Sequence, residues 1–414
     1  MTQLSDDCFA FGGPLLTVEA AQALILERVA PLGGGEVVPL RQALGRILAR
    51  PLVARTPLPP FFNSAVDGYA FRHADLASGE TWLTLAGRVA AGQAGGAIAP
   101  GTASRIFTGA PMPSGADTVM MQEDARLDGD ALLLPSGLKP GANARPAGED
   151  VPAGAEALPT GRRLRAPEIG LAAGLGFAEL PVRPLLRVGV FSTGDELAAP
   201  GATLGPAQTH DSNRFTLMAM LAALPVAITD LGILPDDAAE TAHALRAASA
   251  SQDLLLTSGG VSTGEEDHVR AAIEGAGRLV FWRLAVKPGR PAAMGVVNGV
   301  PMVGLPGNPV AAVITFLHLA RPLLLRLAGA GPEALLRVGA HADFTYRKKL
   351  GRREYVRVTL RETELGLIAE KFPREGAGLL TSLTQSDGFV ELPEAVTEVT
   401  PGQPVRVLPF AAIF

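Results

Sequence analysis

Four loops in the second half of the chain carry residues that could bind an anion. Each loop follows a predicted strand and combines glycine or proline with hydroxyl, amide or charged side chains. The loops span residues 192–196, 258–267, 287–291 and 306–309. Because ligands of an open α/β sheet bind beyond the carboxyl ends of the strands, we expect these four loops to meet at one cleft.

The second loop is the richest in such residues. Glycines after a strand let successive backbone N–H groups point at one anion, so Ser258, Gly259, Gly260 and Ser262 could form a cradle for it. Asp267 could hold a divalent cation, because Mg²⁺ is commonly bound by one or two carboxylates together with substrate phosphates. The alternative is a tight turn whose acidic residues favour the start of the next helix.

The other loops are ambiguous when each is taken alone. Lys287 and Arg290 bracket a Pro-Gly turn and would suit a phosphate or an oxyanion, but a solvated basic turn explains them equally. Asn308 is predicted to cap a helix that begins with Pro309, which would point a helix N-terminus at the cleft. Glu196, after Thr-Gly-Asp at a strand end, is placed to meet a metal or a ribose.

Two further acidic stretches are explained by structure alone. Residues 211–213 and the pair Asp236 and Asp237 each stand where a helix should open. Aspartate, serine and asparagine are all good N-caps, so capping accounts for these positions without a ligand.

Composition excludes several classes of protein. The chain has 414 residues, which suggests two to four domains, with 47 % hydrophobic and 19 % charged residues, as in globular proteins. The net charge of −5 argues against a generally basic nucleic-acid-binding protein. One cysteine, Cys8, excludes a disulfide framework and fits a reducing compartment. With neither a signal peptide nor a long uncharged apolar run, we expect a cytoplasmic protein without membrane or nucleic-acid partners.

Motifs of several common enzyme classes are also missing. The sequence contains no Walker loop and no G-x-G-x-x-G after the first strand of its α/β region. It has neither H-E-x-x-H nor the G-x-S-x-G nucleophile elbow. An anionic, phosphorylated ligand with a divalent cation is the remaining interpretation.

The elements that must position these loops follow from the pattern of strands and helices. Strands alternate with helices over residues 185–335, which predicts a doubly wound, mostly parallel sheet. Asn298-Gly299 predicts a hairpin, so the last two strands should be antiparallel. Residues 56–146 indicate an inserted β-rich domain, and residues 336–414 a small C-terminal β-barrel-like domain.

The segments around the inserted domain should form one discontinuous linker or dimerisation domain, residues 1–55 and 147–184. Helices are predicted over Thr17–Ala30 and Arg41–Ala49, separated by a short strand. The fold class is therefore multidomain, α/β plus β.

Two stretches connect these features to a known family. The first reads P-F-F-N-S-A-V-D-G-Y-A and spans Pro60–Ala70; the second comprises the loops at 258–267, 287–289 and 305–309. With them, the sequence resembles the molybdopterin molybdenumtransferases, which insert molybdenum in the last step of molybdenum-cofactor synthesis. The C-terminal domain of gephyrin belongs to the same family. The resemblance runs over nearly the whole chain, and its motifs are long and ordered.

The resemblance implies a fold and a reaction. Members are elongated homodimers of four-domain subunits, with a molybdopterin-binding α/β domain whose cleft faces the second subunit. Adenylated molybdopterin and molybdate enter, and molybdenum cofactor and AMP leave, with dependence on a divalent cation such as Mg²⁺. Contacts with the molybdopterin adenylyltransferase and with recipient molybdoenzymes are further implied partners.

The resemblance also implies site residues. The implied catalytic residues are Asp67, Glu196, Asp236, Asp267 and Lys287, of which Glu196 and Asp267 would hold the metal. The implied substrate-binding residues are Thr108, Asp150, Ser258, Gly259, Gly260, Ser262, Arg290, Pro306, Gly307, Asn308, Pro309, Arg353 and Ser382. The basic residues between 347 and 353 would give the last domain a cationic face for the phosphorylated pterin, or an ordinary solvated face.

Two positions depart from the family pattern. Phe62 stands where the family usually has aspartate, and Arg283 stands where a second functional lysine is common. Arginine keeps the charge but changes its geometry. The alternatives to the transferase are a non-catalytic dimeric scaffold of the gephyrin type and a tungstate-selective relative.

Overall fold

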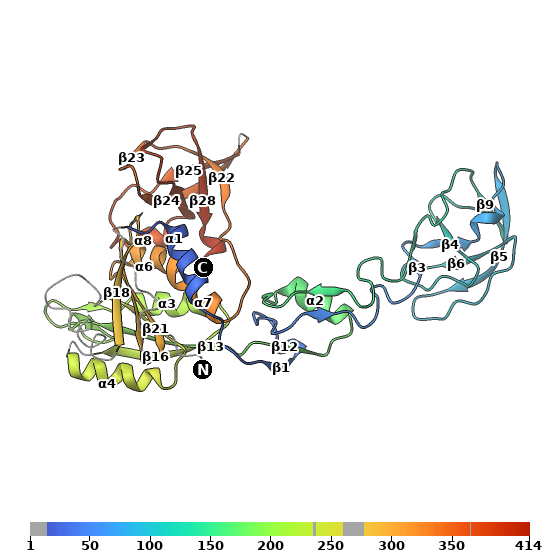
Figure 1. The fold of residues 1–414 in the computed structure, drawn as a ribbon. Coiled ribbons are helices and arrows are strands. Elements are labelled where there is room, and N and C mark those ends of the chain that lie inside the picture. Colours follow the sequence, from blue (N-terminus) through green and yellow to red (C-terminus); the bar gives the residue numbers. More distant parts are fainter. Residues whose placement is uncertain (1–14, 235–236, 260–276, 365) are drawn as a thin grey trace.

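The protein is an elongated molecule with its chemistry-bearing loops at one end. A computed structural model describes residues 15–234, 237–259, 277–364 and 366–414. Figure 1 shows the α/β domain and the C-terminal barrel together at one end, a slender linking part in the middle and the inserted β-rich domain at the other end.

The α/β domain is built on a six-stranded sheet. Its order is β16 (Val226–Leu234), β13 (Leu186–Thr193), β17 (Leu254–Ser258), β21 (Val300–Leu305), β20 (Pro291–Val297) and β18 (Gly277–Arg283). The first four strands are parallel, and β20 is antiparallel to both of its neighbours. Asn298 and Gly299 turn the chain between β20 and β21 with φ of 49° and 78°. The predicted mostly parallel sheet and its hairpin are thus confirmed.

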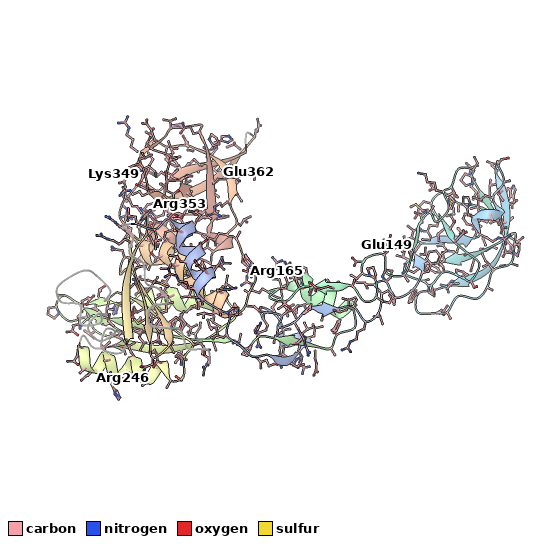
Figure 2. The ribbon with its side chains drawn as sticks, in the orientation of Figure 1. Glu149, Arg165, Arg246, Lys349, Arg353 and Glu362 are labelled. Atoms are coloured by element: carbon pink, nitrogen blue, oxygen red, sulfur yellow. The ribbon has the colours of Figure 1, made fainter. Side chains whose placement is uncertain are left out.

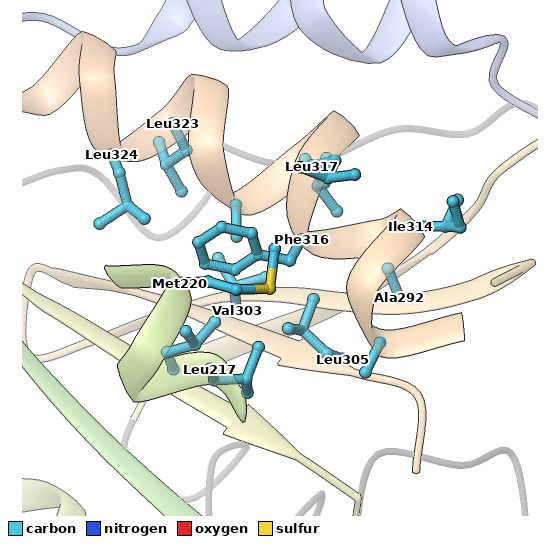
Figure 3. Packing of buried hydrophobic residues seen from close by; sticks show 14 of the residues in the cluster. Leu217, Met220, Ala292, Val303, Leu305, Ile314, Phe316, Leu317, Leu323 and Leu324 are labelled. Carbon is cyan, nitrogen blue, oxygen red and sulfur yellow. The ribbon is translucent and has the colours of Figure 1, made fainter. Parts of the chain in front are cut away.

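Helices cover both faces of this sheet, because its strands alternate their apolar side chains between the faces. Helix α3 (Asn213–Ala222) packs on one face with a long helix formed by α6 (Pro309–Thr315), the π turn η3 (Phe316–Ala320) and α7 (Arg321–Leu327). Helix α4 (Ala238–Ser249) covers the opposite face. Figure 3 shows the first of these cores, where Phe316 and Met220 lie over the strands.

The helix over 309–327 is long and apolar enough to cross a membrane by length and composition. However, 83 % of its most apolar window is buried inside the protein, as expected of a core helix. Helix α1 (Val18–Arg28) packs against α7 and shares the same core through Ala21 and Ile25. The N-terminal helix therefore belongs to the packing of the α/β end (Figure 1).

The linking part joins chain segments from both sides of the inserted domain. Strand β1 (Glu36–Pro39) pairs with β12 (Glu179–Val182), and β2 (Leu52–Val53) pairs with β11 (Glu156–Leu158), beside α2 (Ala166–Gly174). The prediction of a helix over Arg41–Ala49 is wrong. The chain forms only the 3₁₀ turn η1 (Leu40–Gln42), and Gly45 then adopts φ of 77°, which an α-helix does not accommodate.

The inserted domain is a second six-stranded sheet with one parallel pair, β5 with β6. Its order is β7 (Thr118–Met121), β4 (Gly68–Phe71), β6 (Thr102–Ile106), β5 (Thr81–Val89), β9 (Ala131–Leu134) and β8 (Arg126–Asp128). Strand β3 (Asn63–Ser64) pairs with β10 (Ala144–Arg145), and η2 (His73–Asp75) follows β4. A Cβ on Gly68 would lie 1.8 Å from the carbonyl oxygen of Met120, so this motif position requires glycine.

The C-terminal domain is a closed five-stranded barrel. Strands β24 (Arg353–Thr363), β25 (Gly366–Lys371), β22 (Val338–Ala342), β28 (Pro404–Pro409) and β26 (Gly388–Leu392) follow one another, and β26 pairs back to β24. This arrangement confirms the predicted barrel and the fold class. Further short elements of the described residues are β14 (Leu197–Ala198), β15 (Thr209–His210), β23 (Tyr346–Arg347), β27 (Glu398–Val399), α8 (Thr381–Thr384) and η4 (Phe410–Ala412).

One short strand crosses between the two domains. Strand β19 (Val286–Lys287) leaves the α/β domain and pairs in parallel with β24 of the barrel, opposite Arg353 and Glu354. The backbone at the start of the third predicted loop therefore pairs with the C-terminal domain.

Candidate functional site

Three of the predicted loops meet at the carboxyl ends of β13, β17 and β21. The hydroxyl of Ser258 donates to the carbonyl of Pro306 at 3.0 Å and accepts from Nδ2 of Asn213 at 2.9 Å. The same Asn213 nitrogen donates to the carbonyl of Gly307 at 2.7 Å. Helix α3 begins at Asn213, as predicted, and the Asn213 side chain also ties two loops of the cleft together.

Close backbone approach explains the glycines of these loops. A Cβ on Gly307 would lie 3.8 Å from Cα of Gly259, and a Cβ on Gly259 would lie 3.5 Å from the carbonyl oxygen of Thr193. Gly259 also adopts φ of 91°, a conformation that favours glycine. The three strand ends thus form one continuous polar floor.

Four side-chain atoms at these strand ends have no hydrogen-bond partner among the described residues. They are the hydroxyl oxygens of Ser192, Thr193 and Thr257 and the side-chain oxygen of Asn213, and all four are buried. Ser192 and Thr193 are consecutive residues of β13, so their side chains point to opposite faces of the sheet. An unsatisfied buried polar group costs about 1–3 kcal/mol, so each of these atoms needs a partner in the folded protein.

Glu196 stands at the exposed rim of the floor. Its carboxylate folds back over Gly194, where a Cβ would lie 2.2 Å from Oε2. Among the described residues, no group of three or more His, Cys, Asp or Glu side chains is placed to hold a metal. Asp236, Gly260, Ser262 and Asp267 lie outside the described residues. A carboxylate is a donor that Mg²⁺ prefers, but Glu196 alone supplies only part of a metal site.

The fourth loop connects the strand ends to the barrel. Pro309 is the first residue of α6 and Asn308 occupies the N-cap position, as predicted, but the Asn308 side chain makes no capping hydrogen bond. Its Oδ1 instead lies beside Gly378, where a Cβ would come within 3.5 Å. The N–H of Val310 donates to the carbonyl of Ala377 at 3.0 Å. The barrel loop at 376–378 therefore docks on the start of α6.

A cavity of 220 Å³ opens next to this docking contact. Its charged lining comes from Lys287 of the α/β domain and from Arg357, Lys371, Arg374 and Glu375 of the barrel. The cations outnumber the carboxylate four to one. Lys371 lies 2.8 Å from the Glu375 carboxylate and lowers the pKa of that carboxyl group. This cavity is therefore suited to a small anion.

The loop that carries Lys287 packs against helix α6. A Cβ on Gly289 would lie 2.6 Å from Oγ1 of Thr315 on α6, and the Thr315 hydroxyl donates to the Gly289 carbonyl at 3.3 Å. The side chain of Arg290, predicted to bind substrate, is exposed and does not line the cavity. Arg283 is exposed as well.

Ser382 lies behind the cavity and contacts one of its cations. Its buried hydroxyl accepts from Nη1 of Arg357 at 3.0 Å and donates to the carbonyl of Leu379. Arg357, Lys371 and Arg374 were missed at the sequence level. The period-two alternation of β24, which places Arg357 on the same face as Arg353, is the signal that could have indicated Arg357.

Arg353, predicted to bind substrate, occupies a structural junction. Its guanidinium contacts Glu19 of α1 at 2.7 Å and Glu391 and Glu394 of the barrel at 3.3 and 3.1 Å. Burial opposes its charge, but the hydrogen bond to Glu394 and the neighbouring Tyr355 and Glu19 leave the pKa of Arg353 raised. Figure 2 places Arg353 beside α1, between the barrel and the α/β domain.

The neighbouring basic residues are also engaged in the barrel. Arg347 pairs with Glu398 at 2.9 Å, and Arg352 pairs with Glu354 at 2.7 Å. Lys348 is buried and donates to backbone carbonyls, including that of Pro393 at 2.9 Å. Most of the predicted cationic face is therefore engaged in ion pairs or backbone hydrogen bonds, whereas Arg347 and Lys349 are exposed on the surface.

The inserted domain brings two other predicted residues together. Oδ1 of Asp67 accepts from both the backbone N–H and the hydroxyl of Thr108, each at 2.7 Å. The Thr108 N–H is the main reason why the pKa of Asp67 is lowered. Asp150 is exposed, and Figure 2 places its neighbour in the sequence, Glu149, at the neck between the inserted and linking domains. Within one chain, these residues lie at the opposite end from the strand-end loops (Figure 1).

Comparisons with known proteins cover the whole of this architecture. Residues 16–176 match the "MoeA N-terminal region (domain I and II)", residues 189–326 the "Probable molybdopterin binding domain" and residues 340–410 the "MoeA C-terminal region (domain IV)".

Individual relatives match over nearly their full length. The molybdopterin molybdenumtransferase of Haemophilus influenzae is 38 % identical over 96 % of this chain and 99 % of its own. Molybdopterin molybdenumtransferase 2 of Mycobacterium tuberculosis is 37 % identical over 89 % of this chain and 94 % of its own. The crystal structure of the molybdopterin biosynthesis MoeA protein from Pyrococcus horikoshii superposes with a TM-score of 0.79 at 29 % identity, covering 95 % of this chain and 99 % of that one.

Proposed function

This chain belongs to the MoeA family of molybdopterin molybdenumtransferases, and we propose that it transfers molybdenum from molybdate to adenylated molybdopterin. The reaction releases AMP and yields molybdenum cofactor. The cavity at Lys287 is the observation that carries the proposal, because it offers four cations to a small anion next to the barrel loop that docks on the start of α6.

The two parts of the site serve different portions of the substrates. The glycine-rich strand-end loops would bind the phosphorylated pterin through their backbone N–H groups. Lys287 and Arg357 would bind molybdate, a doubly charged oxyanion, in the adjoining cavity. The contact between Val310 and Ala377 keeps these two parts next to each other. Holding both reactants in one place removes much of the entropic cost of their encounter.

A divalent cation completes the proposal. Glu196 would hold Mg²⁺ together with Asp267, and the metal would neutralise charge on the pyrophosphate link when bound. The exposed Glu196 carboxylate at the rim of the floor supports this assignment. We expect the chelator-treated protein to bind molybdate in calorimetry but to release no AMP until Mg²⁺ is restored. AMP release at the full rate in the presence of excess chelator would contradict the metal requirement.

We also propose a homodimer that works in the cytoplasm. The reach of the inserted domain away from the α/β domain supports the first point (Figure 1), and the single cysteine supports the second. In the dimer, Asp67, Thr108 and Asp150 of one subunit would face the strand-end loops of the other. The adenylyltransferase that makes the substrate and the molybdoenzymes that accept the cofactor would be its transient partners.

The direct test uses the purified protein with adenylated molybdopterin, molybdate and Mg²⁺. AMP release and reconstitution of a cofactor-free molybdoenzyme should appear together and should require molybdate. Lys287→Ala should raise the KM for molybdate about tenfold or more, because it removes a cation from the cavity. Binding of the pterin without either product would favour a gephyrin-type scaffold, and preferential use of tungstate would identify a tungstate-selective relative.

A further inference from the structure

The position of the Lys287 side chain depends on the barrel as well as on its own domain. Strand pairing sets Lys287 opposite Glu354 on β24. The Lys287 side chain is half exposed, with 50 % of its surface accessible. A flexible four-carbon side chain at such a position has many rotamers, so a defined ammonium position requires nearby partners.

Two residues of the barrel provide those partners. Nζ of Lys287 lies 3.4 Å from the hydroxyl of Tyr346 and 3.4 Å from Oε2 of Glu354. The Tyr346 hydroxyl donates to the same Oε2 at 2.7 Å, and the side chain of Glu354 is only 1 % exposed. Nε of Arg352 occupies the other carboxylate oxygen at 2.7 Å.

The carboxylate is therefore already satisfied when Lys287 approaches it. Tyr346 and Arg352 take its two oxygens at short range, and Lys287 remains at the longer distance of 3.4 Å. Burial and Glu354 raise the pKa of Tyr346, so its hydroxyl stays a proton donor at all physiological pH values. A carboxylate without the Tyr346 proton would attract the lysine more closely and draw it away from the cavity.

Two cations of the cavity lie near the ring of Tyr346. Its centroid lies 5.9 Å from Nζ of Lys287 and 5.6 Å from Nζ of Lys371. A ring face attracts an ammonium at such distances, so both lysines are held near the cavity despite their mutual repulsion.

We propose that Tyr346 and Glu354 are positioning residues that hold the Lys287 ammonium at the edge of the cavity, ready for the oxyanion. This inference rests on the proposed binding of molybdate at Lys287. Tyr346 and Glu354 act through the lysine and need not touch the substrate themselves.

The test is a double-mutant cycle with Tyr346→Phe and Lys287→Ala. Tyr346→Phe keeps the ring but loses the hydroxyl, and should raise the KM for molybdate about fivefold. The kcat at saturating molybdate and the KM for adenylated molybdopterin should change less than twofold. Calorimetry with molybdate alone should show the same loss of affinity. In the Lys287→Ala background, Tyr346→Phe should have no further effect on molybdate binding.

Arg337→Gln is the control for stability. It removes barrel hydrogen bonds from Arg337 to the Glu391 carboxylate, at 2.5 and 3.2 Å, and Arg337 does not line the cavity. It should lower the Tm without changing the KM for molybdate.

The possible failures can be told apart. If Lys287→Ala leaves molybdate affinity unchanged, the oxyanion assignment itself is overturned. If Lys287→Ala weakens binding but Tyr346→Phe does not, or acts equally strongly without Lys287, the positioning role is overturned and the proposed function is unaffected.

Discussion

At the scale of single residues, one carboxylate, that of Glu375, offsets part of the positive charge of the cavity. Glu375 is an exposed carboxylate whose partner, Lys371, lies 2.8 Å away and belongs to the same cavity lining. An oxyanion that enters the cavity must compete with this carboxylate for the lysine. Glu375 therefore lowers the anion affinity of the free protein.

Glu375→Gln should tighten molybdate binding about two- to fivefold, because the competing charge disappears while the shape of the side chain is kept. The Tm should stay nearly constant, since exposed ion pairs contribute about 0–1 kcal/mol to stability. Calorimetric titration of the variant and the wild-type protein with molybdate measures the change. Unchanged or weaker binding would show that Glu375 does not compete for the site.

Residue types alone predicted only part of the site. Lys287 and Ser258 stand in loops with recognisable glycine and proline spacing, so their positions could be predicted. Arg357 and Lys371 come from ordinary strands of the barrel, and only strand pairing places them beside Lys287. Asn213 has a side chain that can either cap a helix or bridge two loops, and tertiary contacts decide between these roles.

At the scale of elements, the helix over 309–327 contains a buried titratable group. His318 lies in the π turn η3, is 2 % exposed, and packs with its ring centroid 5.1 Å from that of Tyr355. Its Nε2 has no hydrogen-bond partner among the described residues. Burial lowers the pKa of His318 to about 4.

His318 should therefore make the fold sensitive to acid. The neutral form is favoured in the folded state, so stability from this group is complete above a pH of about 6.5 and is lost as the pH falls towards 4. The loss amounts to about 2–3 kcal/mol at pH 4.5. His318→Phe, which keeps a ring against Tyr355, should remove this part of the acid sensitivity. Urea unfolding of both proteins at pH 7 and pH 4.5 tests it; equal losses would contradict it.

The pattern of apolar and polar residues predicted the elements of the α/β domain well. Buried strands and amphipathic helices alternate there, and clear turn residues separate them. It failed at residues 41–49, where leucine and alanine favour a helix but Gly45 and the pairing of Ile47 and Leu48 with the linking part prevent it. Local propensity is a weak preference, and tertiary contacts override it. The strand β19, only two residues long, carried no signal in the sequence at all.

At the scale of the whole molecule, the predicted site is divided between two ends. Asp67 and Thr108 lie on the inserted domain, whereas the strand-end loops and the Lys287 cavity lie at the opposite end (Figure 1). The role of Asp67 in the reaction stays a prediction. A homodimer would bring the two ends together if its subunits lie side by side in opposite directions.

Complementation between two inactive variants tests this arrangement. Asp67→Ala and Lys287→Ala subunits, unfolded together and refolded as a mixture, should regain about a quarter of the wild-type AMP release, because half of the dimers are mixed and each mixed dimer has one intact site. Each variant refolded alone serves as the control. No recovery, with mixed dimers demonstrated by differently tagged subunits, would place both residues in one chain's site.

The pairing of β19 with β24 has a consequence for recombination between relatives. A chimaera joined near residue 335 would keep every predicted domain intact, yet it would combine Lys287 from one parent with Tyr346 and Glu354 from the other. Such hybrids should fold, but their KM for molybdate should differ from that of either parent. The difference should disappear when the residues at 346 and 354 come from the same parent as the lysine. The residues that form this cavity lie on both sides of the junction between the α/β domain and the barrel. A domain exchange that preserves the cavity must therefore transfer residues from both domains together.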